Sequence, residues 1–374
     1  MSAIGWRRVP ASRFITDAGL QSEWDRLNDQ QMALPFLSAD VIAAAIDAFG
    51  NKSEQLLIGS ANGKTVAMLV LVPSGFLRWS TFQPSQMPLG AWVAERQCLP
   101  LDLSRSLLRG ALGMSIGMSI TQIDPLIAPR QDDMPDTLST DYIDTAWIDI
   151  EGSFDDYWAA RGKNLRQNMR KQRNKLAAEG VVTTLRMLRQ PQDIAPAIAR
   201  YGLLESAGWK GSEGTSIHAD NRQGRFYIKL FESAAQRGQA IVFEYLFNDK
   251  TAAINLCLLR NGVLVVLKTT YDESIPKTLS PAFLLREVEL RHIFSSDGIK
   301  RIEYFGRRMD WHTKLTDSYR SLYHLTTFRW PLIKRLASQR RARLEARDAS
   351  DTKGAPKDDG AAIPDKASAT ASAA

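Results

Sequence analysis

Cysteine is nearly absent from this sequence of 374 residues, which contains only two, Cys98 and Cys257, each inside an apolar segment. A small secreted protein held together by disulfides needs a denser framework, so we expect both thiols to be reduced and buried. The four histidines are scattered without the spacing of metal ligands. We therefore expect neither a structural zinc site nor a metal cofactor.

Long hydrophobic runs are also missing. The longest uncharged apolar runs, such as residues 66–72, have the length of a strand and are too short to cross a bilayer. The first residues lack the apolar stretch of a signal peptide. We expect a soluble cytoplasmic protein without a transmembrane segment.

Familiar nucleotide motifs are missing as well. Neither the Walker-type phosphate loop nor the Rossmann glycine fingerprint occurs, so ATP hydrolysis and hydride transfer lose their usual support. Residues 113–117 match the G-x-S-x-G pattern of a nucleophile elbow, which requires a strand before it and a helix after it. Here a helix is expected before it and a strand after it, so we interpret the match as chance.

Positive charge is what the chain has in excess, with a net charge of +7. Residues 161–175 contain seven basic residues and no acid, and residues 334–347 contain six basic residues and one acid. The remainder of the chain is therefore net negative, and the basic character is confined to two predicted helices. The spacing of Leu165, Met169 and Leu176 gives the first of them one apolar face.

The basic segment 161–175 has two interpretations. Its arginines could contact an anionic ligand, such as the phosphates of tRNA, of a lipid-linked precursor or of a nucleotide cofactor. It could equally be a helix whose basic outer face is solvated. Seven like charges without intervening acids repel one another and destabilise a helix, which counts against the second interpretation.

A strand–turn–strand–turn–strand–loop–helix–strand pattern occurs twice. In the first half it predicts strands at 56–61, 65–72, 77–82 and 119–127 with a helix at 102–113. In the second half it predicts strands at 240–247, 251–259, 263–270 and 300–305 with a helix at 280–294. Both first hairpins carry Lys-Thr after the turn, at 64–65 and 250–251. We infer two copies of one α/β unit.

The fold class we expect is therefore α/β, or α+β. It consists of tandem units, each a mixed, mostly antiparallel sheet flanked by helices. The expected boundaries are 1–150 for the N-terminal unit and 151–333 for the C-terminal unit. A basic helix at 334–348 and a disordered, alanine-rich tail at 349–374 follow.

Two places in the second unit have the residue types of a site. Ser280 and Pro281 begin a predicted helix, whose free N–H groups and positive dipole end suit a pyrophosphate; an ordinary capped helix has the same sequence. Ionisable residues at 268–273 end a strand, and an acid, an indole and a lysine lie at 205–211. These groups suit acid–base chemistry without naming a reaction, and solvated charges are the alternative.

Several segments in this order resemble a known family. They are SFDDYWAARGKNLRQNMRKQRNKLAAEG, ESAGWKGSEGTSI, FYIKLFESAAQRGQ, LKTTYDESIPKTLSPAFLL and IEYFGRRMDWHTKLTDSYR. Together they resemble the CelD-like branch of the GNAT acyltransferases, which is associated with cellulose and exopolysaccharide biosynthesis and related in fold to Fem-type aminoacyltransferases. The resemblance covers residues 154–330, with a weaker matching half before it.

The resemblance implies a tandem pair of GNAT-like units and an acyl-CoA-dependent N- or O-acyltransferase, most simply an acetyltransferase. It would transfer the acyl group of acetyl-CoA, or of another acyl-CoA, directly in a ternary complex. The acceptor would be a sugar, a cell-envelope or exopolysaccharide precursor, or a small amine. This sequence departs from the family at Ala282, where glycine is usual, and at His312, where lysine is common; Ala282 would restrict close approach to a phosphate.

The resemblance also implies roles for individual residues. Glu205 or Asp272 would be the base that accepts the acceptor's proton, Tyr271 would protonate the leaving thiolate, and Lys268 would orient substrate or bind an anion. The remaining roles are cofactor binding by Leu267, Thr269, Ser280, Pro281, Ala282, Phe283 and Leu284, and substrate binding by Trp209, Lys210, Tyr304 and Trp311.

Two other functions stay open. A Fem-type enzyme would transfer an amino acid from aminoacyl-tRNA, which the basic segment 161–175 favours, although the coiled-coil arm frequent in that group is missing. A non-catalytic binding module with a GNAT fold is the third reading, and Ala282 supports it. Apart from tRNA, we expect no nucleic-acid partner.

Overall fold

The structure is a computed structural model that describes residues 4–207, 217–218 and 221–339. These form two compact units. The first unit comprises residues 4–31, 51–142 and 322–339, and the second comprises residues 32–50 and 143–321. The division differs from the expected boundary at residue 150, because residues 32–50 belong to the second unit and the chain from residue 322 onward returns to the first.

The first unit is built around a six-stranded sheet. Its strand order is β1-β2-β3-β4-β6-β13, and every pair is antiparallel except β4 and β6, which are parallel. The short β5 pairs with β3 outside this order. Its elements are β1 (Gly5–Pro10), η1 (Ala11–Ile15), α1 (Ala18–Gln31), β2 (Gln55–Ala61), β3 (Lys64–Pro73), β4 (Arg78–Thr81), β5 (Trp92–Ala94), α3 (Pro100–Arg109), β6 (Gly117–Ile123) and β13 (Tyr319–Phe328).

The second unit has a sheet of the same kind. Its order is β8-β9-β10-β11-β12-β7, with β11 and β12 as the one parallel pair. Its elements are η2 (Pro35–Leu37), α2 (Ala39–Phe49), β7 (Thr137–Asp149), α4 (Phe154–Ala159), α5 (Lys163–Ala178), β8 (Thr183–Leu188), α6 (Pro191–Ala207), α8 (Arg222–Gln236), β9 (Ala240–Phe247), β10 (Lys250–Arg260), β11 (Val263–Tyr271), α9 (Pro281–Phe294), β12 (Arg301–Glu303) and α10 (Asp310–Thr313).

The two strand orders are the same, including the position of the parallel pair, so the predicted tandem repeat and fold class are confirmed. The sixth strand of each sheet, however, comes from elsewhere in the chain. β7 follows β6 in sequence but pairs with β12, and β13 follows β12 but pairs with β6. The unit boundaries accordingly fall inside β7 and β13.

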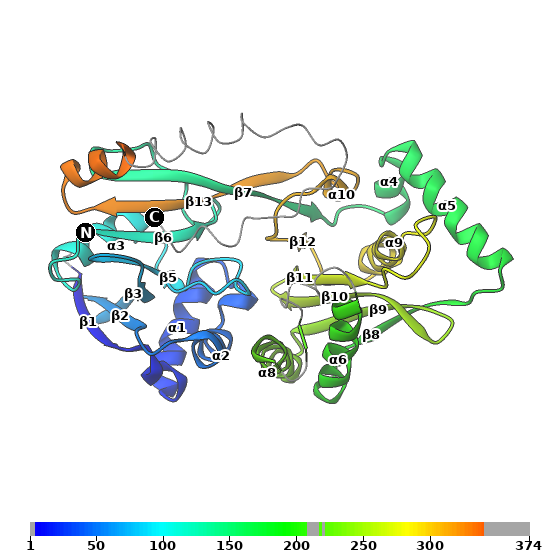
Figure 1. Ribbon diagram of the computed structural model, residues 1–374, viewed down its shortest axis with the longest axis horizontal. Coiled ribbons are helices and arrows are strands. Elements are labelled where there is room, and N and C mark those ends of the chain that lie inside the picture. The colour runs from blue at the N-terminus through cyan, green and yellow to red at the C-terminus, as the bar shows by residue number, and fades with distance from the viewer. Residues whose placement is uncertain (1–3, 208–216, 219–220, 340–374) are drawn as a thin grey trace, which may run out of the picture. The chain divides into compact units, whose positions relative to one another are not determined.

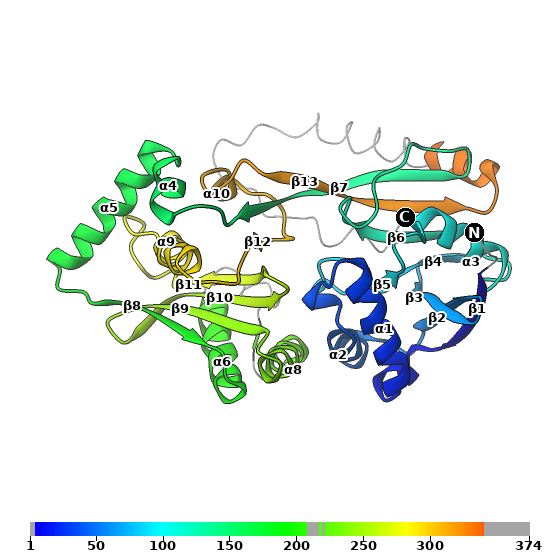
Figure 2. The ribbon, with the colours of Figure 1, turned by 180° about the vertical axis from the view of Figure 1, so that it is seen from behind.

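Helices cover both faces of the second sheet. Figures 1 and 2 show α9 on one face of β9–β11, and α6 and α8 on the other. The face toward α9 is packed with apolar side chains from the strands, α5 and α9, among them Met169, Phe243 and Leu284. The apolar stripe predicted for the basic segment is confirmed, because Leu165, Met169 and Leu176 are the buried residues of α5.

Several smaller expectations have outcomes. Cys98 and Cys257 are free and buried, as predicted. Residues 113–117 lie between the end of α3 and the start of β6, an order that excludes a nucleophile elbow. Residues 331–339 are helical, and the rest of the predicted basic helix, like the tail, lies outside the described residues. None of the described helices is long and apolar enough to span a bilayer.

Candidate functional site

A cavity of about 550 Å³ lies at the beginning of α9. Ser280 and Phe283 form one side of it, and Thr313, Lys314 and Asp317 form another. Ser280 is the N-cap residue and Pro281 occupies the first turn, where its missing N–H costs no hydrogen bond. Such a helix start presents N–H groups and a partial positive charge, so this wall of the cavity suits an anion.

Helix α5 provides the remaining wall. Residues at its start and along one face line the cavity, including Gly162, Asn164, Asn168 and Gln172. The side chain of Gln172 reaches the first turn of α9, where its Oε1 accepts the N–H of Ser280 at 2.7 Å. The basic helix singled out in the sequence is thus part of the cavity and fixes the position of its anion-binding wall.

The basic side chains of α5 are divided between structure and solvent. Arg173 forms an ion pair with the buried Glu287 of α9, and Lys175 donates to Thr278 Oγ1 at 3.1 Å. Arg161, just before the helix, donates to the carbonyl of Leu315 at 2.8 Å and also lines the cavity. The exposed basic residues Lys163, Arg170 and Lys171 face outward. The charge of α5 therefore helps to hold α9 in place, whereas the α5 residues that line the cavity are neutral and the cations in its lining are Arg161 and Lys314.

Strand β11 separates from β12 next to α9. The two strands pair only over Val263–Val265, whereas β11 continues to Tyr271. On its other side, β11 pairs Lys268 with Leu256 and Val266 with Cys257, which leaves Leu267 as a bulge without a partner. A bulge bends a strand and frees its backbone groups. The predicted cofactor residues Leu267 and Thr269 lie on this diverging part of β11.

Beneath β11, on the side of α6 and α8, ionisable and phenolic groups gather. Glu205 of α6 is 5% exposed; its Oε2 accepts the N–H of Ile217 at 2.7 Å and its Oε1 accepts the hydroxyl of Tyr201 at 3.4 Å. Lys268 Nζ lies 5.8 Å from the centre of the Tyr227 ring. Burial lowers the pKa of Lys268, and the charge of Glu205 opposes that shift. Two residues predicted to be catalytic, Glu205 and Lys268, are therefore brought together.

The Tyr227 hydroxyl is a further polar group of this cluster. Tyr227 is 1% exposed, and its hydroxyl has no hydrogen-bond partner in the described structure. Burial raises the pKa of this hydroxyl, so it stays protonated. A buried hydroxyl without a partner is costly, which makes it a group that a ligand would satisfy.

On the α9 side of β11, a second polar network crosses the core. Thr269 Oγ1 donates to Asn255 Oδ1 at 2.8 Å, and Asn255 Nδ2 donates to Glu289 Oε2 at 2.5 Å. Cys257 Sγ lies 3.9 Å from the other Glu289 oxygen. Burial raises the pKa of Glu289 to about 7, although its bond from Asn255 opposes the shift. The side chains of the adjacent residues Lys268 and Thr269 thus lie on opposite faces of the sheet.

Other predicted residues lie at the edges of this site. Tyr271 is exposed at the end of β11, and Asp272 Oδ1 accepts both the N–H and the hydroxyl of Ser274, at 2.9 and 2.6 Å. Asp272 therefore shapes the turn after β11. Pro281 and Leu284 are buried in the base of α9, whereas Ala282 is half-buried.

Two of the residues predicted to bind substrate, Tyr304 and Trp311, form an aromatic cluster with His312. Tyr304 and Trp311 pack edge to face, with ring centres 5.2 Å apart, and His312 stacks on Trp311 at 3.5 Å. Trp209 and Lys210, predicted to bind substrate, lie outside the described residues.

Several polar residues of the site were not predicted from the sequence: Tyr201, Tyr227, Asn255, Arg286 and Glu289. The detectable signal is charge inside an apolar helix, because Arg286 and Glu289 interrupt the buried stretch of α9. Asn255, in the middle of an apolar strand, is a similar signal. Among the described residues, no group of three or more His, Cys, Asp or Glu side chains could hold a metal ion.

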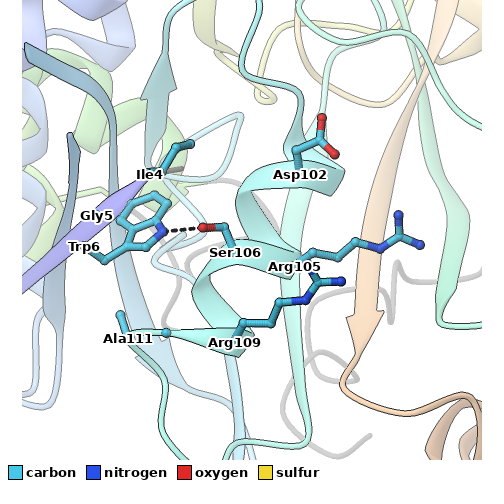
Figure 3. A pocket seen from close by; sticks show the side chains of 9 residues that line it. Ile4, Gly5, Trp6, Asp102, Arg105, Ser106, Arg109 and Ala111 are labelled. Carbon is cyan, nitrogen blue, oxygen red and sulfur yellow. Dashed lines mark hydrogen bonds between the residues drawn. The ribbon is translucent and has the colours of Figure 1, made fainter. Parts of the chain in front are cut away.

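The first unit has a cavity of a different kind, about 710 Å³ in volume. Figure 3 shows it between β1 and the middle and end of α3, where Trp6 Nε1 donates to Ser106 Oγ at 2.8 Å. Arg105 and Arg109 project from the same helix (Figure 3). Because the lining extends from Asp102 to Ala111, this cavity follows the length of α3, whereas the cavity of the second unit lies at a helix start.

Comparison with known proteins identifies part of the second unit. Residues 163–313 match the family model of an acetyltransferase (GNAT) domain. This GNAT segment extends from α5 to α10 and includes every residue of the two polar clusters beside β11. No curated protein matches the sequence.

Solved structures resemble the whole chain at low identity. The C-terminal domain of a putative lysylphosphatidylglycerol synthetase from Agrobacterium fabrum is 13% identical, with a TM-score of 0.52 over 82% of this chain and 92% of that one. L-PGS from Bacillus licheniformis is also 13% identical, with a TM-score of 0.50 over 86% and 96% of the chains. A conserved protein from Bacteroides thetaiotaomicron VPI-5482 is 10% identical, with a TM-score of 0.50 over 87% and 99%. These similarities concern the fold.

Proposed function

We propose that the second unit is an acyltransferase that takes an acyl group from a coenzyme A thioester, most simply acetyl-CoA, and transfers it to an amine or hydroxyl. The observation that carries this proposal is the cavity at the start of α9, where Ser280 lies with the two cations Arg161 and Lys314. A neutral face of α5 and the single acid Asp317 complete the lining. The cavity combines a helix N-terminus with nearby positive charge, which is the chemistry needed for the phosphates of coenzyme A.

The residues around the cavity fit such a donor. Phosphates would be held at Ser280 and Lys314, and the bulged part of β11 at Leu267 would supply backbone groups for the amide-containing arm. Coenzyme A supplies an acyl group activated as a thioester. Gln172 already accepts the N–H of Ser280, Pro281 has no N–H, and the next two after Ala282 donate to the Ser280 carbonyl. The donor would therefore use the N–H of Ala282 or displace the Gln172 side chain.

Glu205 is the better candidate for the base because it lies buried near Lys268 and the Tyr227 hydroxyl, whereas Asp272 lies in the turn after β11; both carboxylates already accept hydrogen bonds. The acceptor's nitrogen or oxygen would attack the thioester carbonyl, and its proton would pass to Glu205. The carbon–sulfur bond would then break, and the thiolate would take a proton from Tyr271. Lys268 and the unpartnered hydroxyl of Tyr227 would hold the acceptor.

The acceptor class follows from the sequence resemblance. The CelD-like motifs favour a sugar, a cell-envelope or exopolysaccharide precursor, or a small amine, handled by a cytoplasmic enzyme without a metal. We keep these as part of the proposal. Trp209 and Lys210, with Tyr304 and Trp311, are its proposed substrate-binding residues.

A second candidate is transfer of an amino acid from aminoacyl-tRNA. The observation that favours it is helix α5, whose exposed basic residues Lys163, Arg170 and Lys171 extend the positive surface beyond the cavity. Binding of tRNA through such residues would weaken steeply as salt rises, because counterions are released on binding. Binding of a small thioester would change much less.

Calorimetric titration of the full chain with coenzyme A, acetyl-CoA and tRNA at two salt concentrations separates the alternatives. Coenzyme A and acetyl-CoA should bind, and acetyl-CoA should raise the melting temperature with the logarithm of its concentration once that concentration exceeds the Kd. If neither thioester nor free coenzyme A binds while tRNA does, the second candidate replaces the first. Binding of coenzyme A without turnover on any amine or sugar panel would leave a non-catalytic module.

A further inference from the structure

Arg286 is a buried cation in the second turn of α9. Arg286 is 7% exposed. The guanidinium carbon lies 3.8 Å from the centre of the Trp311 ring and 5.9 Å from the centre of the Phe283 ring. The stacked ring of His312 supports Trp311 from α10. Arg286 is thus enclosed by aromatic side chains at the place where β11 and β12 have separated.

Within the described structure, the Arg286 guanidinium makes no hydrogen bond and no ion pair. Other arginines in the second unit that approach buried carboxylates are paired: Arg320 with Glu303 at 3.0 Å, and Arg200 with Glu244 at 2.7 Å. Removing a charge from water without a partner is expensive, and buried charges in proteins are normally paired. Stacking on Trp311 offsets part of that cost, by about 2 kcal/mol in a desolvated setting.

The groups around Arg286 do not supply the missing anion. Glu289 on the same helix interacts with it electrostatically but gives its oxygens to Asn255 and Cys257. Tyr304 after β12 and Tyr271 at the end of β11 are neutral phenols within electrostatic range. His312 of α10, kept neutral by burial, brings no negative charge either. No hydrogen bond or ion pair of the described structure joins Arg286 to Glu289, the one acid among these groups, so the guanidinium donors remain available to a ligand.

Phe283 connects this buried cation with the cavity. Its ring contributes to the cavity wall, and Lys314 Nζ lies 5.3 Å from the centre of the same ring. Arg286 and Lys314 are thus two cations beside one phenyl ring, one buried and one at the cavity. A ligand that occupies the cavity and extends past Phe283 would reach Arg286.

We infer that Arg286 binds an oxyanion of the donor ligand, either a carboxylate at the end of its acyl group or a phosphate of its carrier. The planar guanidinium fork matches both groups and holds them by two parallel hydrogen bonds. A carboxylate would make the donor a dicarboxylic acyl thioester, such as the coenzyme A ester of succinic acid. This inference rests on the proposed function, because it assumes that the cavity takes a coenzyme A thioester.

Calorimetric titration of the full chain tests the inference with four probes: coenzyme A, acetyl-CoA, succinyl-CoA and inorganic pyrophosphate. The test variant is Arg286→Met, which keeps the length of the side chain and removes its charge. The matched control is Arg291→Met on the same helix, because Arg291 also lies over an aromatic ring, that of Phe154 at 4.2 Å, but is exposed and forms an ion pair with the exposed Asp155 at 3.3 Å.

A carboxylate partner predicts that wild-type protein binds succinyl-CoA at least tenfold more tightly than acetyl-CoA. Arg286→Met should abolish that preference and leave coenzyme A binding within twofold of wild type. A phosphate partner predicts instead that Arg286→Met weakens all coenzyme A ligands and pyrophosphate by a similar factor of at least ten. Arg291→Met should leave every affinity within twofold.

The inference is overturned if wild-type protein binds coenzyme A, shows no preference for succinyl-CoA, and keeps all its affinities in Arg286→Met. If no thioester binds, the proposed function fails by itself, and titration with pyrophosphate and free succinate then decides the inference. The inference stands if the wild type binds one of these anions and Arg286→Met does not. It falls if neither anion binds the wild type. Should Arg286→Met not fold, Arg286→Lys takes its place, because an ammonium keeps the charge but lacks the fork and should lose most of the preference.

Discussion

The two units share one strand order but differ in the residues that are buried on the helix before the fifth strand. In the first unit that helix is α3, whose buried residues are almost entirely apolar, with Leu103 and Leu107 fully enclosed. In the second unit it is α9, which buries Arg286, Glu287 and Glu289 among its leucines. The same topology thus supports an apolar core in one copy and a polar network in the other.

The starts of these helices differ in the same way. Helix α3 begins at Leu99 and Pro100, without a polar cap, and the neighbouring cavity follows the side of the helix. Helix α9 begins at Ser280 and Pro281, and its start forms a wall of a cavity. Both keep proline in the first turn, which is the feature that the fold requires. The serine, the space and the surrounding charge are what function would add.

The largest expected effect concerns the two carboxylates proposed as base. Glu205→Gln should lower turnover by 10²-fold or more on a working acceptor, because it removes proton acceptance but keeps the shape of the side chain. Asp272→Asn should change turnover less than threefold, since Asp272 Oδ1 is occupied by Ser274. Steady-state kinetics of both variants measure this, with melting temperatures to verify folding.

Retention of full turnover in Glu205→Gln would remove Glu205 from the mechanism. A strong loss in Asp272→Asn alone would move the base to the end of β11. Equal and full activity of both variants would mean that neither carboxylate accepts the proton and that another group serves as the base.

The second effect separates the units by their response to pH. His324 in the first unit and His312 in the second both accept a backbone N–H at Nδ1, from Gln122 at 3.1 Å and Met309 at 2.8 Å. Burial lowers the pKa of each to about 4, from 6.5. Between pH 4 and 6.5 the unfolded chain binds more protons than the folded one, so each histidine makes the free energy of unfolding rise with pH, by up to about 3 kcal/mol.

Glu289 opposes this rise in the second unit only. Burial raises its pKa from the ordinary 4.5 to about 7 in the folded protein, so the folded state binds the proton more tightly. Its contribution is full below pH 4.5 and is lost as pH rises through 7, again by about 3 kcal/mol at most. We expect the free energy of unfolding, measured with urea from pH 4 to 7.5, to rise less steeply with pH in His324→Gln. In Glu289→Gln it should rise more steeply than in the wild type. Unchanged slopes in both variants would contradict the assignment of these titrations.

The third effect tests the helix starts with matched substitutions. Ser280→Asp should weaken coenzyme A binding about tenfold, because a carboxylate at the cavity repels phosphate, which corresponds to about 1.4 kcal/mol. Leu99→Asp places the same charge at the start of α3 and should leave the affinity unchanged. Aspartate is a favourable N-cap residue, so both variants should fold. Equal losses in the two variants would show that both units take part in binding.

The fold was largely predictable from the sequence because its signals are local. Turn residues at 62–63 and 261–262 mark hairpins, and the structure has strands on both sides of each. The basic helix and its apolar stripe follow from spacing alone. The exchange of β7 and β13 was not predictable, because either sheet edge offers the same antiparallel hydrogen bonds and nothing in the strand sequence names the partner.

The site was predictable only where a local rule applies. Ser280 was found from capping chemistry, and it lines the cavity. Glu205 and Lys268 were named as candidates, but the hydrogen bond from Ile217 to Glu205 needs a glycine at 202, where a Cβ atom would meet the carbonyl of Ile217 at 2.5 Å. Asp272 stays an alternative to Glu205, because a carboxylate in a turn and a carboxylate in a site look alike in sequence. Arg286 was missed because its burial results from distant Trp311.

The smallest expected effect lies in the first unit. Arg105 and Asp136 form an ion pair with nitrogen–oxygen distances of 2.5 and 2.9 Å beside the cavity of Figure 3, and Arg105 lowers the pKa of Asp136. Both side chains remain about a quarter exposed, so solvent screens the pair. Arg105→Ala should therefore lower the free energy of unfolding by no more than about 1 kcal/mol.

The same variant should leave coenzyme A affinity within twofold, as should Arg109→Ala on the next turn of α3. Titration calorimetry checks this alongside the Ser280→Asp measurement. A tenfold loss of affinity in Arg105→Ala would overturn the contrast between the units, because the cavity beside α3 would then bind the donor although the first turn of that helix carries an acid, Asp102, and no polar N-cap. An unchanged affinity would mean that the first unit shares the strand order of the second, but that α3 takes no part in donor binding.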